Sequence, residues 1–214
     1  MEISQKPLTT TSHALLGLLA IRPWSTYELA KQVQRSLGWF WPRAERKLYD
    51  EPKHLVMAGL ATAVVQHTGT RPRTMYAITH DGREAVRAWL DGPSAPPTLE
   101  FEAMVRVFFA DGGTLEQLRA TLAEVESAAA TQIAELASMI TDLVTASETG
   151  APDEFAGRRA INALGLRFHL DHQHLLIDWS RWARKQTAGW ISTTDPGNWE
   201  WRDALSGVAR PGSP

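Results

Sequence analysis

Apolar residues in the first 60 positions of the chain recur with the period of an α-helix in three separate runs. The first run follows Ser12, which is suited to cap a helix; the second follows Ser25 and Thr26 and stops at Gly38. The apolar stripes of these two runs consist of Leu15, Leu18 and Leu19, and of Leu29, Val33 and Leu37. We therefore expect two short amphipathic helices.

The third run, which starts after Pro42, separates charged from apolar side chains. At 100° per residue its cationic face carries Arg43, Arg46, Lys47 and Lys53, with Tyr49 at the border. Its apolar face carries Trp41, Leu48, Leu55 and Val56. Such a helix can pack on a core and enter the DNA major groove, although Asp50 would repel phosphate and Pro52 predicts a kink. A solvated amphipathic helix is the alternative for this run taken alone.

Two strand-like runs follow the third helix. Residues 61–67 and 73–78 are expected to be strands, joined by a turn that carries Arg71 and Arg73. Thr79 is suited to cap a fourth helix. Three helices followed by a β-hairpin form the order of a winged helix-turn-helix, and arginine at the tip of such a wing can reach the DNA backbone or the minor groove.

The segment of residues 92–97, Gly-Pro-Ser-Ala-Pro-Pro, divides the chain because it cannot continue a helix. We expect a DNA-binding domain in residues 1–91, a helical dimerisation and effector domain in residues 98–190, and a tail in residues 191–214. The helices predicted for the second domain cover residues 98–111, 114–148 and 156–188. The predicted fold is mainly α with a small β wing, and its second domain resembles a coiled coil.

Residues 115–146 carry a heptad repeat with apolar residues at most a and d positions. A helix of about 35 residues is about 50 Å long, which favours pairing with a second chain over burial in a small monomer. The residues expected at this dimer interface are Leu115, Leu118, Leu122, Val125, Leu136, Met139 and Leu143. Pairing within one chain is the alternative, because the last helix offers a similar stripe in Ile161, Leu164, Phe168, Leu175, Trp179 and Trp182.

Charge is distributed unequally between the two halves. Residues 1–90 hold twelve Lys and Arg against seven Asp and Glu, whereas the remaining residues hold ten against seventeen. This asymmetry favours a basic, partner-binding N-terminal half. The absence of cysteine excludes disulfides, thiol catalysis and cysteine-bound metals. Because no signal-peptide core and no apolar run of about 18 residues is found, we expect a cytoplasmic protein that does not enter a membrane.

Three histidines close together in the sequence are the candidate metal ligands of the chain. His169, His172 and His174 suggest a metal site, but His174 points about 200° away from His172 on a helix, so at most two can ligate together. We therefore expect no metal and no cofactor, and we interpret His172 as a histidine at a helix interface that bonds to a neighbour. Nucleophile-elbow, phosphate-loop and zinc-protease motifs are missing, so no catalytic residue and no enzyme is expected.

The chain is rich in tryptophan, with nine residues. Large flat side chains favour planar ligands, so an aromatic pocket near the junction of the two halves is one interpretation, and core or interface packing is the alternative. The residues expected to line such a pocket are Trp89, Trp179 and Trp182.

Three segments of the N-terminal half resemble the PadR family of transcriptional regulators. They are ALLGLLAIRPWSTYELAKQV, LGWFWPRAERKLYDEPKHLVMAGL and TRPRTMYAITHDGREAVRAWL. The long helical remainder resembles the subgroup with an extended C-terminal dimerisation region. The resemblance implies a homodimeric repressor that binds an inverted-repeat operator on double-stranded DNA and is released by a small aromatic or lipophilic effector.

Family DNA contacts carried over by motif position fall on Tyr27, Lys47, Tyr49, Lys53, Arg71 and Arg73. The stretch Ala44-Glu45-Arg46-Lys47 departs from the pattern frequent in the family, so base preference does not transfer. A helical interaction or scaffold protein, which uses its winged-helix half to bind protein, is the alternative function. Salt dependence separates the two, because binding to phosphates weakens steeply with ionic strength.

Overall fold

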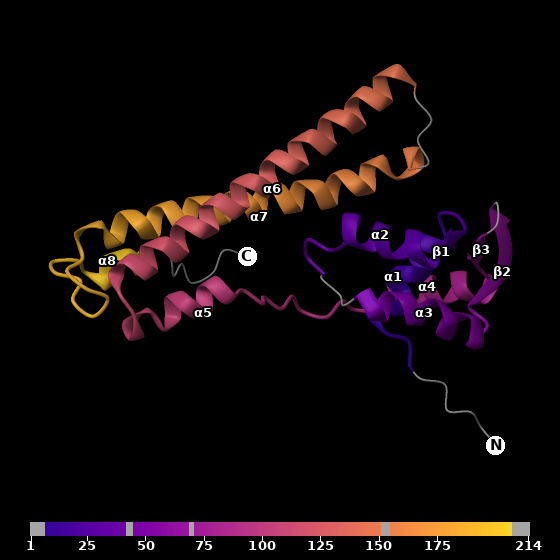
Figure 1. The fold of residues 1–214 in the computed structure, drawn as a ribbon, viewed down its shortest axis with the longest axis horizontal. Coiled ribbons are helices and arrows are strands. Elements are labelled where there is room, and N and C mark those ends of the chain that lie inside the picture. Colours follow the sequence, from indigo (N-terminus) through magenta and orange to yellow (C-terminus); the bar gives the residue numbers. More distant parts are fainter. Residues whose placement is uncertain (1–6, 42–44, 69–70, 151–154, 207–214) are drawn as a thin grey trace. The chain divides into compact units, whose positions relative to one another are not determined.

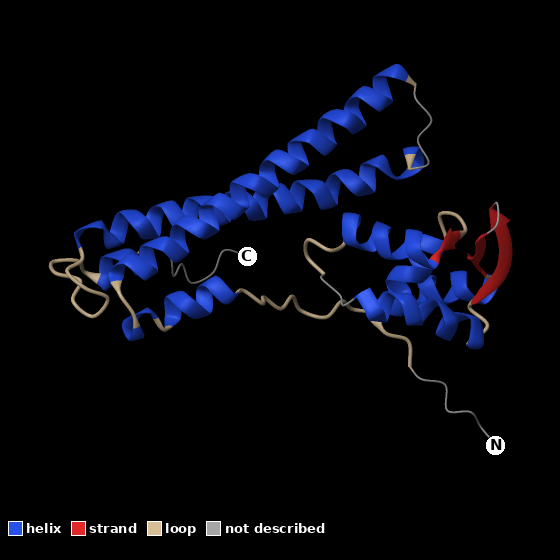
Figure 2. Ribbon diagram, in the orientation of Figure 1, coloured by secondary structure: helices blue, strands red, loops and turns tan. Residues whose placement is uncertain are grey.

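The computed structural model of the 214-residue chain describes residues 7–41, 45–68, 71–150 and 155–206. The chain divides into two compact units, residues 1–97 and residues 98–214 (Figure 1). Helices account for most of the described residues, and the strands are confined to the first unit (Figure 2). The fold is therefore mainly helical with a small antiparallel wing.

The described part of the first unit has the element order of a winged helix-turn-helix. Its elements are α1 (Thr10–Leu19), β1 (Trp24–Ser25), α2 (Thr26–Ser36), α3 (Glu45–Met57), β2 (Ala61–Thr68), β3 (Arg71–Ile78) and α4 (His80–Leu90). The strands form an antiparallel sheet in the order β1-β3-β2. We call β2, β3 and their connection the wing. The two-residue strand β1 was not predicted, because so short a segment carries no periodic signal.

Hydroxyl and carboxylate side chains fix where the helices begin. Ser25 caps α2 and Thr79 caps α4, as predicted. The prediction that Ser12 caps α1 is wrong: Thr9 is the N-cap, and Ser12 lies at the third helical position, where it completes a reciprocal capping box. In the sequence the two hydroxyls are equally suited to cap this helix, and only the backbone conformation distinguishes them.

A closed apolar core holds the first unit together. Helices α1, α2 and α3 each bury leucines against one another. Helix α4 begins so close to the residue before β2 that a Cβ at Gly82 would collide with the carbonyl oxygen of Leu60. The most deeply buried apolar side chains of this core are Leu15, Leu16, Leu19, Leu29, Val33, Leu48 and Leu55. These side chains therefore form a core that is closed within one chain.

Two long antiparallel helices dominate the second unit (Figure 1). Its described elements are α5 (Glu102–Phe108), η1 (Ala110–Gly112), α6 (Leu115–Thr149), η2 (Ala156–Arg158), α7 (Arg159–Gln186), η3 (Thr187–Gly189) and α8 (Trp201–Leu205). The N-cap Thr114 and its partner Gln117 form a capping box at the start of α6. Helices α6 and α7 lie side by side and separate towards the C-terminal end of α6 (Figure 1).

The heptad repeat of α6 is filled largely by α7 of the same chain. Leu118 and Leu122 form a buried cluster with Ala183 of α7, against which Leu115 and Trp179 pack. Further along α6 the predicted interface residues Val125 and Leu136 are also buried, whereas Met139 is half-buried and Leu143 is exposed. Leu118, Leu122, Val125 and Leu136 are therefore buried within one chain. Of the α7 stripe that the sequence analysis offered as their alternative partner, Trp179 packs on this core, whereas Ile161, Leu164, Phe168, Leu175 and Trp182 are exposed.

Helix α7 presents two different faces. Its inner face, packed towards α6, consists of His169, Gln173, Ile177, Ser180 and Ala183, all of which are buried. Its outer stripe consists of Ile161, Leu164, Phe168, Leu175 and Trp182, all of which are exposed. Four members of the outer stripe recur every seven residues, as in a coiled-coil seam. These five large apolar side chains of α7 therefore lie outside the contact with α6, whereas Ile177 and Trp179 are part of it.

The segment after α7 folds back on the second unit. The Trp199 indole nitrogen donates to the Gln186 side chain at 2.8 Å, and the rings of Trp199 and Trp190 lie 5.2 Å apart. Trp199 is thus docked at the C-terminal end of α7. Among the helices that the structure describes, none is both long and apolar enough to cross a membrane.

Candidate nucleic-acid interface

Helix α3 has one buried and one exposed face. Leu48, Pro52 and Leu55 are buried, whereas Lys47 and Lys53 are exposed, with Asp50 also at the surface. The helix runs without interruption through Pro52. Arg43 lies outside the described residues, and so do the side chains of Arg46 and Arg71. The helix thus combines a core face with a surface that presents two lysines.

The aromatic candidates on the helix-turn-helix differ in accessibility. Tyr27, in the first turn of α2, has 64% of its surface exposed. Tyr49 is half-buried, as its position at the border between the two faces of α3 predicts. A hydroxyl on an exposed ring can donate to a phosphate oxygen, so Tyr27 has the geometry of a backbone contact.

Arg73 connects the wing to the start of α2. Its guanidinium pairs with the Glu28 carboxylate and donates to the Ser25 hydroxyl at 3.0 Å. Burial raises the pKa of Glu28, but the hydrogen bonds from Arg73 and Ser25 outweigh it and lower the pKa from 4.5 to about 2. Glu28 therefore stays ionised at neutral pH and holds the partly exposed guanidinium of Arg73 against the start of α2. Sequence analysis assigned Arg73 to DNA, since the contact with Glu28 spans 45 positions and carries no local signal.

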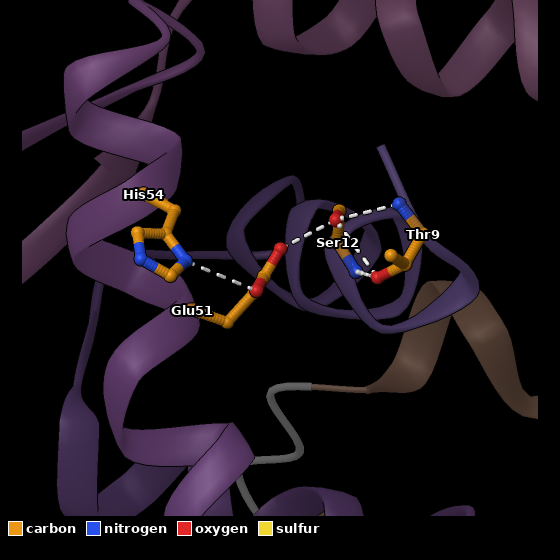
Figure 3. A network of polar contacts seen from close by, with 4 residues as sticks. All are labelled: Thr9, Ser12, Glu51 and His54. Atoms are coloured by element: carbon orange, nitrogen blue, oxygen red, sulfur yellow. Dashed lines mark hydrogen bonds and ion pairs between the residues drawn. The ribbon is translucent and has the colours of Figure 1, made fainter. Parts of the chain in front are cut away.

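A polar network ties the start of α1 to α3 (Figure 3). The Ser12 hydroxyl donates to one Glu51 carboxylate oxygen, and the His54 ring nitrogen lies 3.5 Å from the other. The same Ser12 oxygen accepts from the Thr9 amide at 2.9 Å. Ser12 is buried, so this network fixes a point in the middle of α3 against α1. Sequence reasoning did not find it.

The tryptophans proposed as ligand contacts have different surroundings. Trp89 of α4 is exposed, and its ring stacks on His13 of α1 with centroids 5.0 Å apart and planes 8° apart. Trp179 packs against the buried cluster between α6 and α7, so its ring belongs to that core. Trp182 is exposed on the outer stripe. Of the three, Trp89 is the one already in a stacked geometry that suits a planar partner.

The histidines of α7 do not gather around one point. His169 is buried on the inner face, where burial and then the charge of His172 lower its pKa. His172 stacks on Phe168, and His174 is exposed. Within the described residues, no three histidines or acidic side chains are placed to share a metal ion.

Two protein families match the two units. Residues 15–88 match the transcriptional regulator PadR-like family, and residues 101–187 match the virulence activator alpha C-term family. The first unit belongs to the PadR-like family of transcriptional regulators. That family comprises regulators and not enzymes.

Similar proteins support the same classification. The negative transcriptional regulator PadR of Bacillus subtilis is 30% identical over 99 residues, which are 45% of this chain and 54% of that protein. The chain spans about half the length of the curated relatives it matches. A crystal structure of Bacillus subtilis PadR in complex with operator DNA has a TM-score of 0.72 at 21% identity, covering 84% of this chain and 98% of the other.

The structure of the same Bacillus subtilis protein in complex with p-coumaric acid has a TM-score of 0.64 at 21% identity. It covers 83% of this chain and 98% of the other. At these identities the two solved structures establish a shared fold, with a winged helix-turn-helix followed by long helices.

Proposed function

We propose that this PadR-like chain is a homodimeric transcriptional repressor that binds an inverted-repeat operator and releases it when a planar aromatic acid binds. The observation that carries the proposal is the exposed, lysine-bearing face of α3 in a winged helix-turn-helix whose fold is shared with a PadR solved on operator DNA. A helix with this division of faces can pack on its core and enter a major groove.

The proposed DNA surface consists of Lys47 and Lys53 on α3 and Tyr27 on α2. Both lysines are exposed and lie on the same element, so they can neutralise neighbouring phosphates. Arg73 has a different role in this proposal: its bonds to Glu28 and Ser25 set the position of the wing. Arg43, Arg46 and Arg71 stay predicted contacts from the sequence.

A homodimer is supported by the outer stripe of α7. An apolar heptad seam that faces solvent in one chain is the usual place for a second helix to pack. Phe168, Leu175 and Trp182 are large enough to bury substantial area there. Two copies related by a two-fold axis would present two α3 helices to an operator with matching symmetry.

An aromatic effector is supported by Trp89 and by the p-coumaric acid complex of the Bacillus subtilis relative. The exposed ring of Trp89 is held parallel to the His13 ring, which fixes its orientation. A planar acid that stacks there would bind better to one arrangement of the protein than another, and this difference is what shifts a conformational equilibrium.

Operator binding is tested by charge removal. After selection of bound fragments from genomic DNA, Lys47→Ala should weaken binding by about 1–3 kcal/mol if it contacts a base, or by less with a shallower salt dependence if it contacts phosphate. Arg87→Ala removes the same charge from an exposed position on α4 of the same unit and serves as the matched control. Equal effects of the two variants would place the DNA surface elsewhere.

The same assay tests the rest of the proposal. Addition of p-coumaric acid to the wild-type complex should release the operator, and Trp89→Phe should raise the concentration required. Failure of every phenolic acid to release DNA would leave a constitutive regulator. Binding that does not weaken with rising salt would favour apolar docking of a protein partner over DNA.

A further inference from the structure

The cations of the second unit are concentrated at one place. Residues 98–214 contain ten Lys and Arg against sixteen Asp and Glu, so the unit as a whole is acidic. Nevertheless four of the ten line one hollow of about 510 Å³ beside the C-terminal end of α7, together with one carboxylate. The lining residues are Arg119, Glu126, Arg181, Arg184, Lys185 and Ala188. The hollow therefore has the opposite charge to the unit that contains it.

Glu126 compensates only part of this charge. Arg181 donates to one of its carboxylate oxygens at 2.7 Å, and Arg184 donates to the other at 2.8 Å. The hydrogen bond from Arg181, followed by that from Arg184, lowers the pKa of Glu126, so the carboxylate stays ionised. Two guanidinium groups thus share one negative charge and leave one positive charge uncompensated.

Arg119 and Lys185 add two further positive charges. The Arg119 guanidinium donates through one nitrogen to the carbonyl oxygens of Thr187 and Ala188, which neutralise no full charge. Lys185 is paired with no carboxylate in the part of the chain that the structure describes. The hollow therefore carries three positive charges in excess.

The helix dipole explains only part of the cluster. Cations are favoured at a helix C-terminus, which accounts for Arg184 and Lys185 in the last turn of α7. Arg119 comes from α6, and Arg181 precedes the last turn. Each of the three guanidinium groups uses one of its nitrogens in the bonds described, so N–H donors remain on all three.

We propose that this hollow binds a small, multiply charged oxyanion, carrying phosphate or carboxylate groups, that bridges α6 and α7. Guanidinium groups match the oxygens of both groups with paired hydrogen bonds, and the ammonium of Lys185 supplies a further point charge. Ala188 is the one apolar residue of the lining, so a planar apolar molecule has little to contact there. The site is distinct from Trp89 and does not depend on DNA binding.

Calorimetric titration of the full-length protein with pyrophosphate and with citrate, at constant ionic strength, tests the proposal. At least one of the two should bind saturably, and the tighter one identifies phosphate or carboxylate as the preferred chemistry. The double variant Arg184→Gln/Lys185→Gln should weaken binding by at least about tenfold, because charge-assisted bonds are lost. It keeps the Arg181–Glu126 bond, so the pairing of α6 with α7 retains one ionic link.

Two further variants separate a site from a general salt effect. Arg167→Gln removes an exposed arginine from the same helix, where it pairs with Asp171, and should leave affinity unchanged. Glu126→Gln removes the resident negative charge and should tighten binding several-fold. Absence of saturable binding by either anion, equal weakening in Arg167→Gln, or weaker binding in Glu126→Gln would each overturn the proposal.

Discussion

The core helices of the first unit and helix α7 of the second unit differ in where their bulky apolar side chains lie. In the first unit, Leu15 and Leu29 are completely buried, and the charged residues lie at the surface. On α7 of the second unit, Ser180 is completely buried and His169 is 3% exposed, whereas Phe168 is 62% exposed. One unit has thus completed its core within a single chain, and the other keeps a row of apolar side chains in water.

This difference shows that apolar character alone does not say which face of a helix meets which neighbour. Small residues such as Ser180 and Ala183 line the inner face of α7, and small side chains let two helices approach closely. The bulky residues are left for another contact. We therefore interpret α7 as a helix with two interfaces, one made during folding and one made by a second copy of the chain.

The largest expected effect comes from a charge on the outer stripe. Phe168→Asp should raise the dimer dissociation constant at least about a hundredfold, because an unpaired buried charge costs several kcal/mol. The variant should still fold, since Phe168 faces solvent in a single chain. Light scattering at micromolar concentration measures the mass. His174→Asp introduces the same charge at an exposed position of α7 outside the stripe and should remain dimeric. A monomeric wild type would refute the interpretation.

A truncation in each unit sharpens the comparison. Leu29→Ala should lower the free energy of unfolding by about 2–5 kcal/mol, because it leaves a cavity in a closed core. Leu175→Ala, which truncates an exposed leucine, should cost much less in a dilute monomer and act mainly through dimer affinity. Denaturant unfolding at several protein concentrations distinguishes the two effects. Equal losses that do not depend on concentration would show that both leucines belong to folded cores.

The smallest expected effect is a loss of folding stability at acidic pH. The pKa of Glu28 is lowered in the folded protein, so its contribution is fully present above pH 4.5 and is lost as pH falls towards 2. We expect about 1–2 kcal/mol from this group, allowing for solvent near the pair. Glu28→Gln should abolish that part of the acid sensitivity. Urea unfolding at pH 7 and pH 3 compares the variants, and an unchanged pH dependence would contradict the assigned role of Arg73 and Glu28.

The parts of the fold that local patterns encode could be predicted from the sequence. Periodic leucines, capping residues and the Pro-rich segment indicate the helices and the wing, because these signals act over a few residues. The contacts of Arg73 with Glu28 and of Ser12 with Glu51 join residues 45 and 39 positions apart, and neither partner is unusual in its own segment.

The face of α7 that packs on α6 could not be predicted from the sequence, for a different reason. The heptad of α6 includes Leu122 and Leu136, which suggested a partner seam of equally large residues. The partner is instead the inner face with His169 and Ser180, which resembles a solvated surface when read as a sequence. Shape complementarity between helices decides this pairing, and it becomes visible only once both backbones are placed.

The network between α1 and α3 has a practical consequence for redesign of operator preference. Ser12 and Thr9 set how α3 is held, although they precede Glu51 by about forty positions and do not lie on α3 themselves. A variant library limited to the exposed residues of α3 would change side chains on a helix whose orientation relative to α1 stays fixed. Including positions 9 and 12 would also change the orientation of α3, and with it the directions in which Lys47 and Lys53 of the proposed DNA surface point.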